Sequence, residues 1–333
     1  MTAPLTIGIA GLGYWGPNLA RNFSAIAGCE ITWLCDRDPD AVARAAALHP
    51  EARTTAELDA LLSDPALDAI VLATPVPTHA PLAVRVLEAG KHCFVEKPLA
   101  TAGADAELAL QAAQCSGRTL MVGHLLEYHP GVRALKELAD IGELGDRIYY
   151  VYGNRLNLGR LRADENALWS LGAHDVSVLL LLAGEEPVEA VAHGASYVRS
   201  GVQDVVFCFL RFPSRLTAHL HLSWLDPHKE RRFTVVGSRR MATFDDMALE
   251  RKLTVYDKGF DEDARTYGEY ITRSGGSFSP RIANVEPLRV ECEEFVQSIR
   301  SGQPPRSDAD SGLRVVRVLE RLQASLDQGL GRG

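Results

Sequence analysis

Gly11-Leu12-Gly13-Tyr14-Trp15-Gly16 lies between a short apolar run, Leu5–Ala10, and a segment with helical spacing of apolar residues, Gly16–Ala25. A Gly-x-Gly-x-x-Gly turn between a strand and a helix is typical of dinucleotide binding. Gly11 permits the tight turn, Gly13 lets the backbone approach a pyrophosphate, and Gly16 lets the helix pack on the strand. The N–H groups that begin the helix then face the phosphates. We predict a dinucleotide-binding unit here, with Tyr14 and Trp15 among its cofactor-binding residues.

A second apolar run, Glu30–Cys35, ends at Asp36, which comes 20 residues after Gly16. An acidic side chain at this point accepts hydrogen bonds from the adenosine ribose hydroxyls and repels a 2′-phosphate. The predicted cofactor is therefore NAD. Arg37 keeps NADP open as an alternative, because a guanidinium can bind a 2′-phosphate.

Strand and helix patterns alternate through the first third of the chain. The apolar runs are Leu5–Ala10, Glu30–Cys35, Ala69–Ala73, Cys93–Glu96 and Leu120–Val122. Such continuous runs suit parallel strands that are buried on both faces. Thr54 and Glu57 have the spacing of a capping box and predict a helix start between two of these strands. The repeated units predict a doubly wound Rossmann domain over residues 1–124.

After about Gly123 the pattern changes to long strands without helices between them. These are Ile148–Leu156, Val188–Val198, Val205–Phe212, Leu216–Trp224 and Arg232–Gly237. Consecutive strands without crossovers are antiparallel, and the strict alternation in Leu216–Trp224 predicts one buried and one polar face. With helices predicted at 171–183, 287–301 and 310–327, this indicates an α+β domain over 125–333 on an open, mainly antiparallel sheet. The charged, glycine-rich segment Asp257–Phe278 is expected to be a loop or lid.

Further candidate residues follow two of the N-terminal strands. Ala73-Thr74-Pro75-Val76-Pro77-Thr78-His79 and Glu96-Lys97-Pro98 both lie at the carboxyl edge of the predicted sheet, where ligands bind. Thr74, Pro75 and His79 are predicted to bind the cofactor near the nicotinamide ribose. For His79 the alternative is a residue that simply begins a helix.

The Glu96-Lys97 pair ends a buried strand, where charges are costly unless they are used. We expect Lys97 to point into the cofactor crevice. A positively charged nicotinamide there would lower its pKa towards the range that suits proton transfer at neutral pH. A solvated lysine at a strand end is the alternative.

The bulk composition narrows the class of protein. The 333 residues favour two domains, and the formal net charge of −8 argues against a nucleic-acid partner. No apolar run approaches the roughly 20 residues that cross a bilayer, and the first residues do not resemble a signal peptide. The six cysteines form no CxxC pair and are predicted to be buried and reduced. We expect a cytoplasmic protein without membrane contact.

The chain resembles the glucose–fructose oxidoreductase/inositol dehydrogenase (Gfo/Idh/MocA) family in the order and spacing of three motifs. These are the glycine turn with Asp36, the Ala-Thr-Pro-x-x-x-His sequence and Glu-Lys-Pro. The resemblance covers essentially the whole chain. It implies an NAD-dependent dehydrogenase in which Lys97 is catalytic and binds the substrate hydroxyl. The family's Asp-x-Gly-x-His stretch corresponds to Ser170–His174, so His174 is implied as the second catalytic residue. Ser170 replaces the family's acid, and Asp175 or a more distant acid would have to assist His174.

The stretch from Arg155 to Asp175 resembles one branch of that family, which serves amino-sugar synthesis for surface polysaccharides and lipid A. Its members oxidise the 3-hydroxyl of a nucleotide sugar such as UDP-N-acetylglucosamine, and a partner aminotransferase uses the ketone. The resemblance implies substrate contacts from Lys97, Arg160, Asn166, Ser170 and His174. Arg160 and Arg162 could meet a diphosphate, although isolated surface arginines are the commoner case.

The resulting hypothesis places an alcohol carbon over C4 of the nicotinamide, with Lys97 and His174 at its hydroxyl. His174 is favoured as the base and Lys97 as the polarising group, but either can serve. The alternatives are a dehydrogenase of a free sugar or inositol, and a non-catalytic dinucleotide-sensing protein on the same fold.

His219 and His221 share the polar face of one predicted strand. No cysteine or acid cluster joins them, so we predict no metal site. An open sheet with a mixed polar face suits contact with a second copy, and a homodimer or homotetramer through this sheet is expected.

Overall fold

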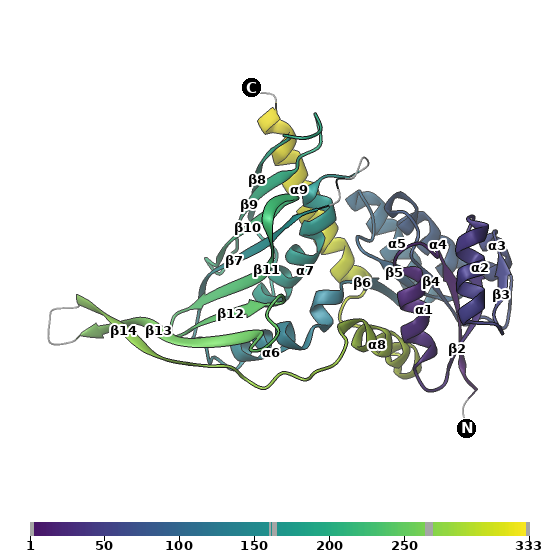
Figure 1. Cartoon of the computed structure of the whole chain (residues 1–333), viewed down its shortest axis with the longest axis horizontal. Helices are drawn as coiled ribbons and strands as arrows, with labels where there is room; N and C mark the ends of the chain where they lie inside the picture. Colours follow the sequence, from purple (N-terminus) through teal and green to yellow (C-terminus); the bar gives the residue numbers. More distant parts are fainter. Residues whose placement is uncertain (1–2, 160, 162–164, 264–268, 331–333) are drawn as a thin grey trace. The chain divides into compact units, whose positions relative to one another are not determined.

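The structure is a computed structural model that describes residues 3–159, 161, 165–263 and 269–330 (Figure 1). The chain divides into two compact units. Unit 1 contains the residues up to Tyr128 together with Val285–Arg317, and unit 2 contains His129–Asn284 and the residues from Val318 onward. The chain therefore returns to unit 1 after it has built most of unit 2. No helix within the described ranges is long and apolar enough to span a membrane.

Unit 1 is built on six parallel strands in the order β3-β2-β1-β4-β5-β6, which confirms the predicted Rossmann sheet. The strands are β1 (Leu5–Ala10), β2 (Cys29–Cys35), β3 (Arg53–Thr55), β4 (Ala69–Leu72), β5 (His92–Glu96) and β6 (Leu120–Gly123). The strand order reverses between β1 and β4. A crevice is expected at the carboxyl ends of strands on either side of such a reversal.

The helices between these strands follow the predicted alternation of strand and helix, with one difference at a helix start. They are α1 (Gly16–Ser24), α2 (Pro39–Leu48), α3 (Leu58–Leu62), α4 (His79–Glu88) and α5 (Gly103–Ser116). The Asp38 side chain accepts a hydrogen bond from the Asp40 N–H at 3.0 Å and caps α2, with Pro39 at the first helical position. The expected capping box at Thr54 is wrong, because Thr54 lies in β3. The neighbouring Thr55 hydroxyl instead accepts the Glu57 N–H at 3.0 Å.

The core of unit 1 is completed from the far end of the sequence. Helix α8 (Pro287–Ser301) lies beside α1 (Figure 1). Phe23 of α1, Phe94 of β5 and Phe295 of α8 form a buried edge-to-face cluster with ring centroids 5.7, 5.9 and 6.0 Å apart. Such aromatic packing buries much apolar area and fixes α8 against the sheet.

Unit 2 contains an eight-stranded sheet in the order β14-β13-β12-β11-β7-β10-β9-β8. The strands are β7 (Ile148–Leu158), β8 (Glu189–Ala195), β9 (Val205–Arg211), β10 (Thr217–Ser223), β11 (Leu225–Gly237), β12 (Met241–Asp245), β13 (Leu253–Asp263) and β14 (Glu269–Phe278). All neighbouring strands are antiparallel except β7 and β10. The predicted open, mainly antiparallel sheet is confirmed.

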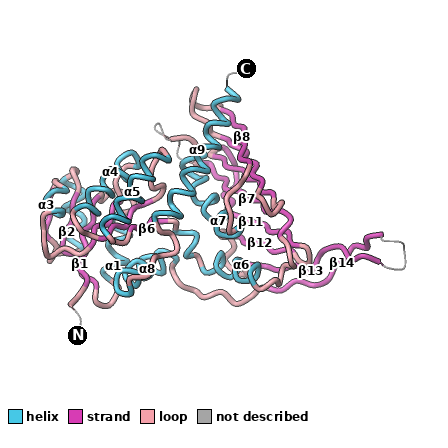
Figure 2. The backbone as a smooth tube through the Cα atoms, turned by 180° about the vertical axis from the view of Figure 1, so that it is seen from behind, coloured by secondary structure: helices cyan, strands magenta, loops and turns pink. Residues whose placement is uncertain are grey.

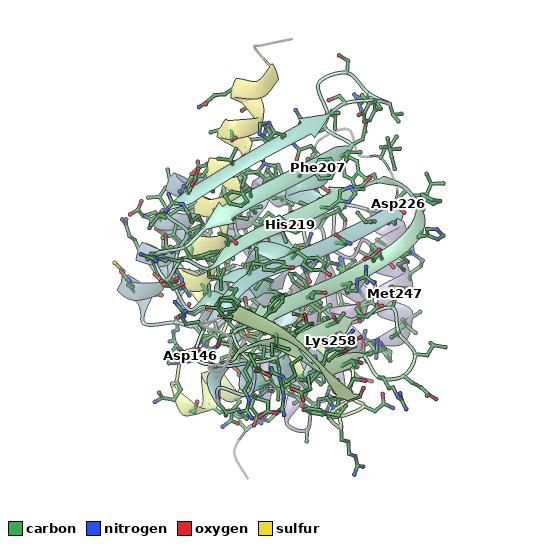
Figure 3. The ribbon with its side chains drawn as sticks, turned by 90° about the vertical axis from the view of Figure 1, so that its left-hand side faces the viewer. Asp146, Phe207, His219, Asp226, Met247 and Lys258 are labelled. Carbon is green, nitrogen blue, oxygen red and sulfur yellow. The ribbon has the colours of Figure 1, made fainter. Side chains whose placement is uncertain are left out.

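One face of this sheet packs on helices and the other carries exposed rings. Helices α6 (Pro130–Asp140), α7 (Ala173–Ala183) and the end of α9 (Ala309–Leu330) lie along the first face (Figure 2). On the second face Tyr152 stacks on His219 at 5.2 Å, and Phe207 stacks on His221 at 4.4 Å (Figure 3). The polar outer face of β10 therefore follows the predicted alternation.

The expectation of a loop or lid at Asp257–Phe278 is wrong. Strands β13 and β14 pair as a long antiparallel hairpin (Figure 1). Its sequence mixes charged, aromatic and glycine residues without regular alternation, so the period-two pattern of a half-buried strand is missing. Backbone pairing does not require that alternation, because the ladder is formed by N–H and C=O groups alone.

Candidate active site

The three glycines of the turn after β1 meet three different surroundings. Gly11 has a positive φ of +95°, and a Cβ at this position would lie 2.4 Å from the Ala73 carbonyl oxygen. A Cβ at Gly16 would lie 2.0 Å from the Gly11 carbonyl oxygen, whereas a Cβ at Gly13 would meet nothing within 4 Å. Gly11 and Gly16 are thus required by backbone packing, and Gly13 leaves open space in which a phosphate fits.

Asp36 connects the end of β2 to this turn. Its Oδ2 accepts the Leu12 N–H at 2.5 Å and its Oδ1 accepts the Asp38 N–H at 2.9 Å. Each carboxylate oxygen has a further lone pair for a ribose hydroxyl. The predicted ribose-binding acid therefore also fixes the glycine turn.

A cleft of about 630 Å³ opens beside these groups. This volume lies within the roughly 300–1,000 Å³ typical of small-molecule sites. Six predicted cofactor residues line it: Gly11, Gly13, Asp36, Arg37, Thr74 and Pro75. The open space at Gly13, the start of α1 and the acid at Asp36 together fit the pyrophosphate and ribose of a dinucleotide.

Sequence reasoning missed several residues of this cleft. They are Cys35, Glu57, Asp59, Thr78, Leu82 and Arg85, among others. Thr78, at the N-cap position of α4, and Leu82 and Arg85 within α4 lie at helical spacing, a signal that could have identified them. Arg85 pairs with Asp59, so this cation is already engaged. Since Asp59 and Arg85 neutralise each other, Asp36 and Glu57 outweigh Arg37 in this lining, which disfavours a 2′-phosphate in agreement with the prediction of NAD.

Tyr14 and Trp15 lie on the outer side of the turn. Tyr14 is 85% exposed and Trp15 is 36% exposed, and their rings meet edge to face at 5.8 Å. Neither is part of the cleft lining. Their predicted contact with the cofactor therefore stays a prediction.

His79 begins α4 and is only 1% exposed. Its Nδ1 lies 2.8 Å from the Pro98 carbonyl oxygen, and its Nε2 lies 2.7 Å from the Thr74 carbonyl oxygen. Burial, with a contribution from the charge of Lys97, lowers the pKa of His79. The ring is thus held between two backbone segments and does not line the cleft.

Glu96 is the last residue of β5, and Lys97 follows it at the carboxyl edge of the sheet. The Lys97 N–H donates to Glu96 Oε2 at 3.3 Å. Burial raises the pKa of Glu96 to about 7, against the opposing charge of Lys97. Both side chains are partly buried, so this strand end combines a catalytic candidate with a carboxyl group that titrates near neutrality.

The interior of unit 1 near this strand end holds other titratable groups. His124, after β6, is fully buried, and burial with the charge of Lys97 lowers its pKa to about 3. Glu291 of α8 is 1% exposed, and neither of its carboxyl oxygens has a hydrogen-bond partner among the described residues. Burial and the charges of Glu96, Glu127 and Glu294 raise the pKa of Glu291 well above its ordinary value. These surroundings favour the neutral form of the Glu291 carboxyl group.

The second group of predicted residues lies in unit 2. Ser170 belongs to a π-helical turn, η3 (Leu168–Gly172), and His174 lies in the first turn of α7. Short π-helical segments occur frequently at functional sites. Both side chains are partly buried. Arg160 and Arg162, the predicted phosphate contacts, lie outside the described residues.

Asn166 has a role within unit 2 that the sequence did not reveal. Its amide Nδ2 donates to Gln203 and Gln323 at 2.9 Å each, and its Oδ1 accepts the Trp169 N–H at 3.2 Å. Both amide hydrogens are thus used to hold the π-helical turn against its neighbours. The predicted substrate contact of Asn166 stays untested.

Asp175, the candidate assistant of His174, is engaged elsewhere. Its two carboxylate oxygens bind the Arg155 guanidinium through Nε and, at 3.3 Å, through Nη2. Both residues are buried. A buried, bidentate pair of this kind holds β7 to α7, so Asp175 stabilises the helix that carries His174.

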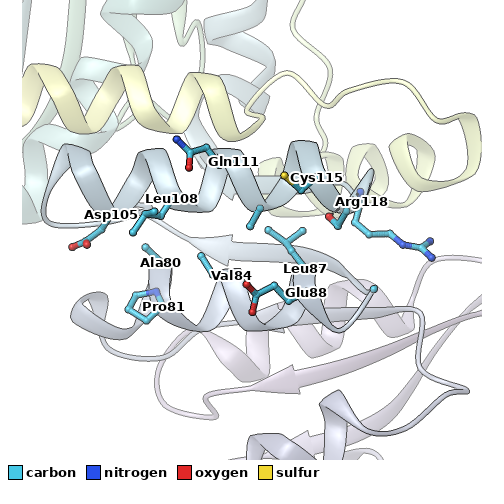
Figure 4. A pocket seen from close by; sticks show the side chains of 13 residues that line it. Ala80, Pro81, Val84, Leu87, Glu88, Asp105, Leu108, Gln111, Cys115 and Arg118 are labelled. Atoms are coloured by element: carbon cyan, nitrogen blue, oxygen red, sulfur yellow. Dashed lines mark hydrogen bonds between the residues drawn. The ribbon is translucent and has the colours of Figure 1, made fainter.

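A second hollow of about 740 Å³ lies between α4 and α5 (Figure 4). Its lining is mostly apolar, from residues such as Val84, Leu87 and Leu108, and contains none of the predicted site residues. In the part of the chain that the structure describes, no group of three or more His, Cys, Asp or Glu residues could hold a metal ion.

Comparison with protein families assigns both parts of the chain. Residues 5–124 match the model of an oxidoreductase family with an NAD-binding Rossmann fold, Gfo/Idh/MocA. Residues 132–243 match a Gfo/Idh/MocA C-terminal domain.

Full-length relatives with known structures have the same architecture. UDP-N-acetylglucosamine 3-dehydrogenase from Acidithiobacillus ferrooxidans is 26% identical, with a TM-score of 0.85 over 99% of this chain and 100% of that chain. A putative oxidoreductase from Magnetospirillum magnetotacticum is 30% identical, with a TM-score of 0.83 over 96% of this chain and 100% of that one. A further relative, compared by sequence and matched over part of its length, is inositol 2-dehydrogenase 2 from Saccharopolyspora erythraea, which is 30% identical over 62% of each chain.

Proposed function

The chain belongs to the Gfo/Idh/MocA oxidoreductase family, and on this basis we propose that it oxidises a secondary alcohol of a sugar with NAD⁺. The favoured substrate is the 3-hydroxyl of a nucleotide sugar such as UDP-N-acetylglucosamine. The observation that carries this choice is full-length similarity to a UDP-N-acetylglucosamine 3-dehydrogenase, which covers 98% of both chains. The position of Lys97, directly after β5 at the carboxyl edge of the sheet, supports the chemistry.

NAD⁺, when bound, supplies the hydride acceptor. Gly11, Gly13 and Asp36 would hold its pyrophosphate and adenosine ribose in the cleft described above. We propose that Lys97 and His174 reach the substrate hydroxyl together. His174 takes the proton of that hydroxyl, while Lys97 orients and polarises the oxygen; the reverse assignment is the alternative.

Glu96 gives this proposal a further physical basis within unit 1. Its carboxyl group is adjacent to Lys97 and has a pKa of about 7, so its charge varies around neutral pH. When ionised it favours the protonated form of Lys97, which is the form that polarises an oxygen. The proposed polarising role of Lys97 therefore agrees with the charge of its neighbour.

A second candidate is the oxidation of a free sugar or inositol. The observation that favours it is 30% identity to an inositol 2-dehydrogenase over 213 residues, which exceeds the identity to the nucleotide-sugar enzyme. A substrate panel separates the two, with NADH absorbance as the readout and UDP-N-acetylglucosamine, N-acetylglucosamine and myo-inositol as substrates. Turnover of the nucleotide sugar alone supports the first candidate. Tight NAD binding without turnover of any compound would support a dinucleotide sensor instead.

We further propose that the exposed face of the unit 2 sheet joins two copies of the chain, as a homodimer or as half of a homotetramer. This face carries Tyr150, Phe207 and Phe209, each at least 38% exposed, beside the stacked His219 and His221 (Figure 3). Clustered exposed rings are typical of protein interfaces. We propose a cytoplasmic location, in agreement with six cysteines that form no disulfide; five are buried as predicted, whereas Cys115 is exposed.

A further inference from the structure

The His79 ring lies between two peptide carbonyls that belong to different parts of the site. Thr74, on the Nε2 side, lines the cofactor cleft. Pro98, on the Nδ1 side, directly follows Lys97. One buried side chain therefore links the loop after β4 to the turn after β5.

The contacts continue from this ring back to the glycine turn. The backbone of Ala73 and Thr74 packs so closely on Gly11 that a Cβ there would lie 2.4 Å from the Ala73 oxygen and 2.8 Å from the Thr74 nitrogen. A continuous series of contacts thus runs from Gly11 through Thr74 and His79 to Pro98. A shift of the glycine turn would be transmitted to the backbone beside Lys97.

The protonation state of the ring decides which of the two carbonyls receives a hydrogen bond. Burial, the positive charge of Lys97 and the position at the N-terminus of α4 all disfavour a charged imidazole. Among the residues that the structure describes, no acidic side chain contributes to the pKa of His79, and its two carbonyl partners only partly oppose these effects. A neutral ring has one N–H, so it can donate to only one carbonyl.

Burial of the two carbonyl-bearing residues indicates where that N–H lies. Pro98 is buried, whereas Thr74 is partly exposed at the cleft. A buried carbonyl without a donor is more costly than one that water or a ligand can reach. The N–H is therefore assigned to Nδ1, which donates to Pro98, and the ring then meets the Thr74 oxygen across the 2.7 Å contact by packing and not by a hydrogen bond.

We propose that His79 is a positioning residue that, through its Nδ1–H, fixes the Lys97–Pro98 turn in register with the cofactor cleft. The proposal rests on the proposed role of Lys97. It differs from the expectation that His79 contacts the nicotinamide ribose, since the ring is buried and acts through the two backbone segments.

Three substitutions test the assignment, because amide side chains imitate one ring nitrogen each. His79→Asn places an N–H near the position of Nδ1, His79→Gln places one near Nε2, and His79→Ala provides neither. At saturating NAD⁺ we expect kcat to fall about tenfold in the Ala and Gln variants, as for loss of one buried hydrogen bond, and to stay within about threefold in the Asn variant. The Kd for NAD⁺ should stay within about threefold in all three.

Hydrogen exchange gives a readout that does not depend on turnover. Peptides covering residues 96–101 should exchange faster in the Ala and Gln variants than in the wild type and the Asn variant, and peptides covering residues 11–16 should not. Thr78→Val serves as the matched control from the same loop. Its hydroxyl lines the cleft and bonds to Thr74, so this change should weaken NAD⁺ binding without faster exchange at 96–101.

The proposal is overturned by weaker NAD⁺ binding with unchanged kcat in His79→Ala, which would make His79 a cofactor contact. Rescue by Gln instead of Asn, or unchanged exchange at 96–101 in the Ala variant, would also overturn it. Absence of sugar turnover in the wild type would defeat the proposed function alone, because the exchange experiment still tests the role of His79.

Discussion

The Asp36 carboxylate accepts the Leu12 N–H at 2.5 Å, which joins the acid at the end of β2 to the interior of the glycine turn. The group predicted to select the adenosine ribose thus also shapes the surface on which the pyrophosphate would lie. On this prediction, cofactor choice and turn geometry are coupled through one side chain.

Substitution Asp36→Ala should therefore weaken NAD⁺ binding and relax cofactor choice together. The variant loses the carboxylate that is predicted to accept hydrogen bonds from the ribose hydroxyls. We expect the KM for NAD⁺ to rise by at least about tenfold. The preference for NAD⁺ over NADP⁺ should shrink, since Arg37 remains and the repelling charge is gone. Steady-state kinetics with both cofactors measures this preference. If the ratio of kcat/KM for NAD⁺ to kcat/KM for NADP⁺ were unchanged, the assigned role of Asp36 would be contradicted.

Gly13→Ala and Gly16→Ala form a matched pair with opposite expected effects. A Cβ at Gly13 meets nothing within 4 Å, so this variant should keep the wild-type Tm and lose NAD⁺ affinity. A Cβ at Gly16 would lie 2.0 Å from the Gly11 oxygen, so that variant should unfold at lower temperature. Thermal melts with and without NAD⁺ distinguish the two. Equal losses of Tm would show that the turn has another geometry.

Glu291→Gln should stabilise the protein, and the gain should increase with pH. Folding raises the pKa of Glu291 well above its ordinary value of 4.5. As the pH rises above 4.5, the unfolded chain loses this proton while the folded protein keeps it, so the free energy of unfolding falls. Glutamine imitates the neutral acid and removes this effect. At about pH 5 the Glu291→Gln variant and the wild type should have the same Tm. At about pH 8.5 the variant should have the higher Tm.

Glu294→Gln provides the control for that experiment. Glu294 lies on the same helix, accepts the Arg306 N–H at 2.8 Å and pairs with the Arg306 guanidinium at 3.5 Å. Its neutralisation removes a favourable contact and should not raise the Tm at either pH. A lower Tm for Glu291→Gln at the upper pH would mean that Glu291 is ionised and paired.

Asp175→Asn should destabilise unit 2 strongly. The Arg155–Asp175 pair is buried, and removal of one partner leaves an uncompensated guanidinium. The expected loss is about 3–5 kcal/mol in the free energy of unfolding. Denaturant titration measures it, with Glu189→Gln at the exposed Arg211–Glu189 pair as a control that should change stability by about 1 kcal/mol or less. Similar small losses in both variants would indicate that the Arg155 pair is not buried.

The parts of this fold that the sequence predicts are those with local causes. The glycine turn, the strand ending at Asp36 and the alternation in Leu216–Trp224 each follow from spacing within a few residues, and the corresponding elements are present. The β13–β14 hairpin is not predictable from Asp257–Phe278, because this segment lacks the regular alternation of a half-buried strand and the buried residues of β13, Leu253 and Val255, lie before it. The return of α8 to unit 1 depends on contacts such as Phe295 with Phe23, which lie far apart in the sequence.

The same distinction applies to the candidate site. Residues at strand ends, such as Asp36, Thr74 and Lys97, are predictable because parallel strands end at one edge of the sheet. The link between His79 and Pro98 and the use of Asp175 by Arg155 are not predictable, since they depend on which groups burial brings together. A sequence motif thus identifies the position of a side chain more readily than its hydrogen-bond partner.

The role of Lys97 can be separated from cofactor binding by substitution. Lys97→Met keeps the length of the side chain and removes its charge and hydrogen-bond donors. We expect kcat/KM for the sugar to fall by roughly 10²–10⁴, the usual contribution of a positioned acid–base group, while the Kd for NAD⁺ changes little. An activity loss explained entirely by weaker NAD⁺ binding would contradict the catalytic role.

The most direct test follows the hydrogen atom itself. Wild-type protein is incubated with NAD⁺ and UDP-N-acetylglucosamine that carries deuterium at C3, and the reduced cofactor is examined by mass spectrometry. The account predicts that deuterium appears in the NADH formed by the wild type, and that Lys97→Met forms far less labelled product at equal NAD⁺ occupancy. NADH that lacks deuterium, or bound NAD⁺ that is never reduced by any sugar, would contradict the proposed oxidation at C3.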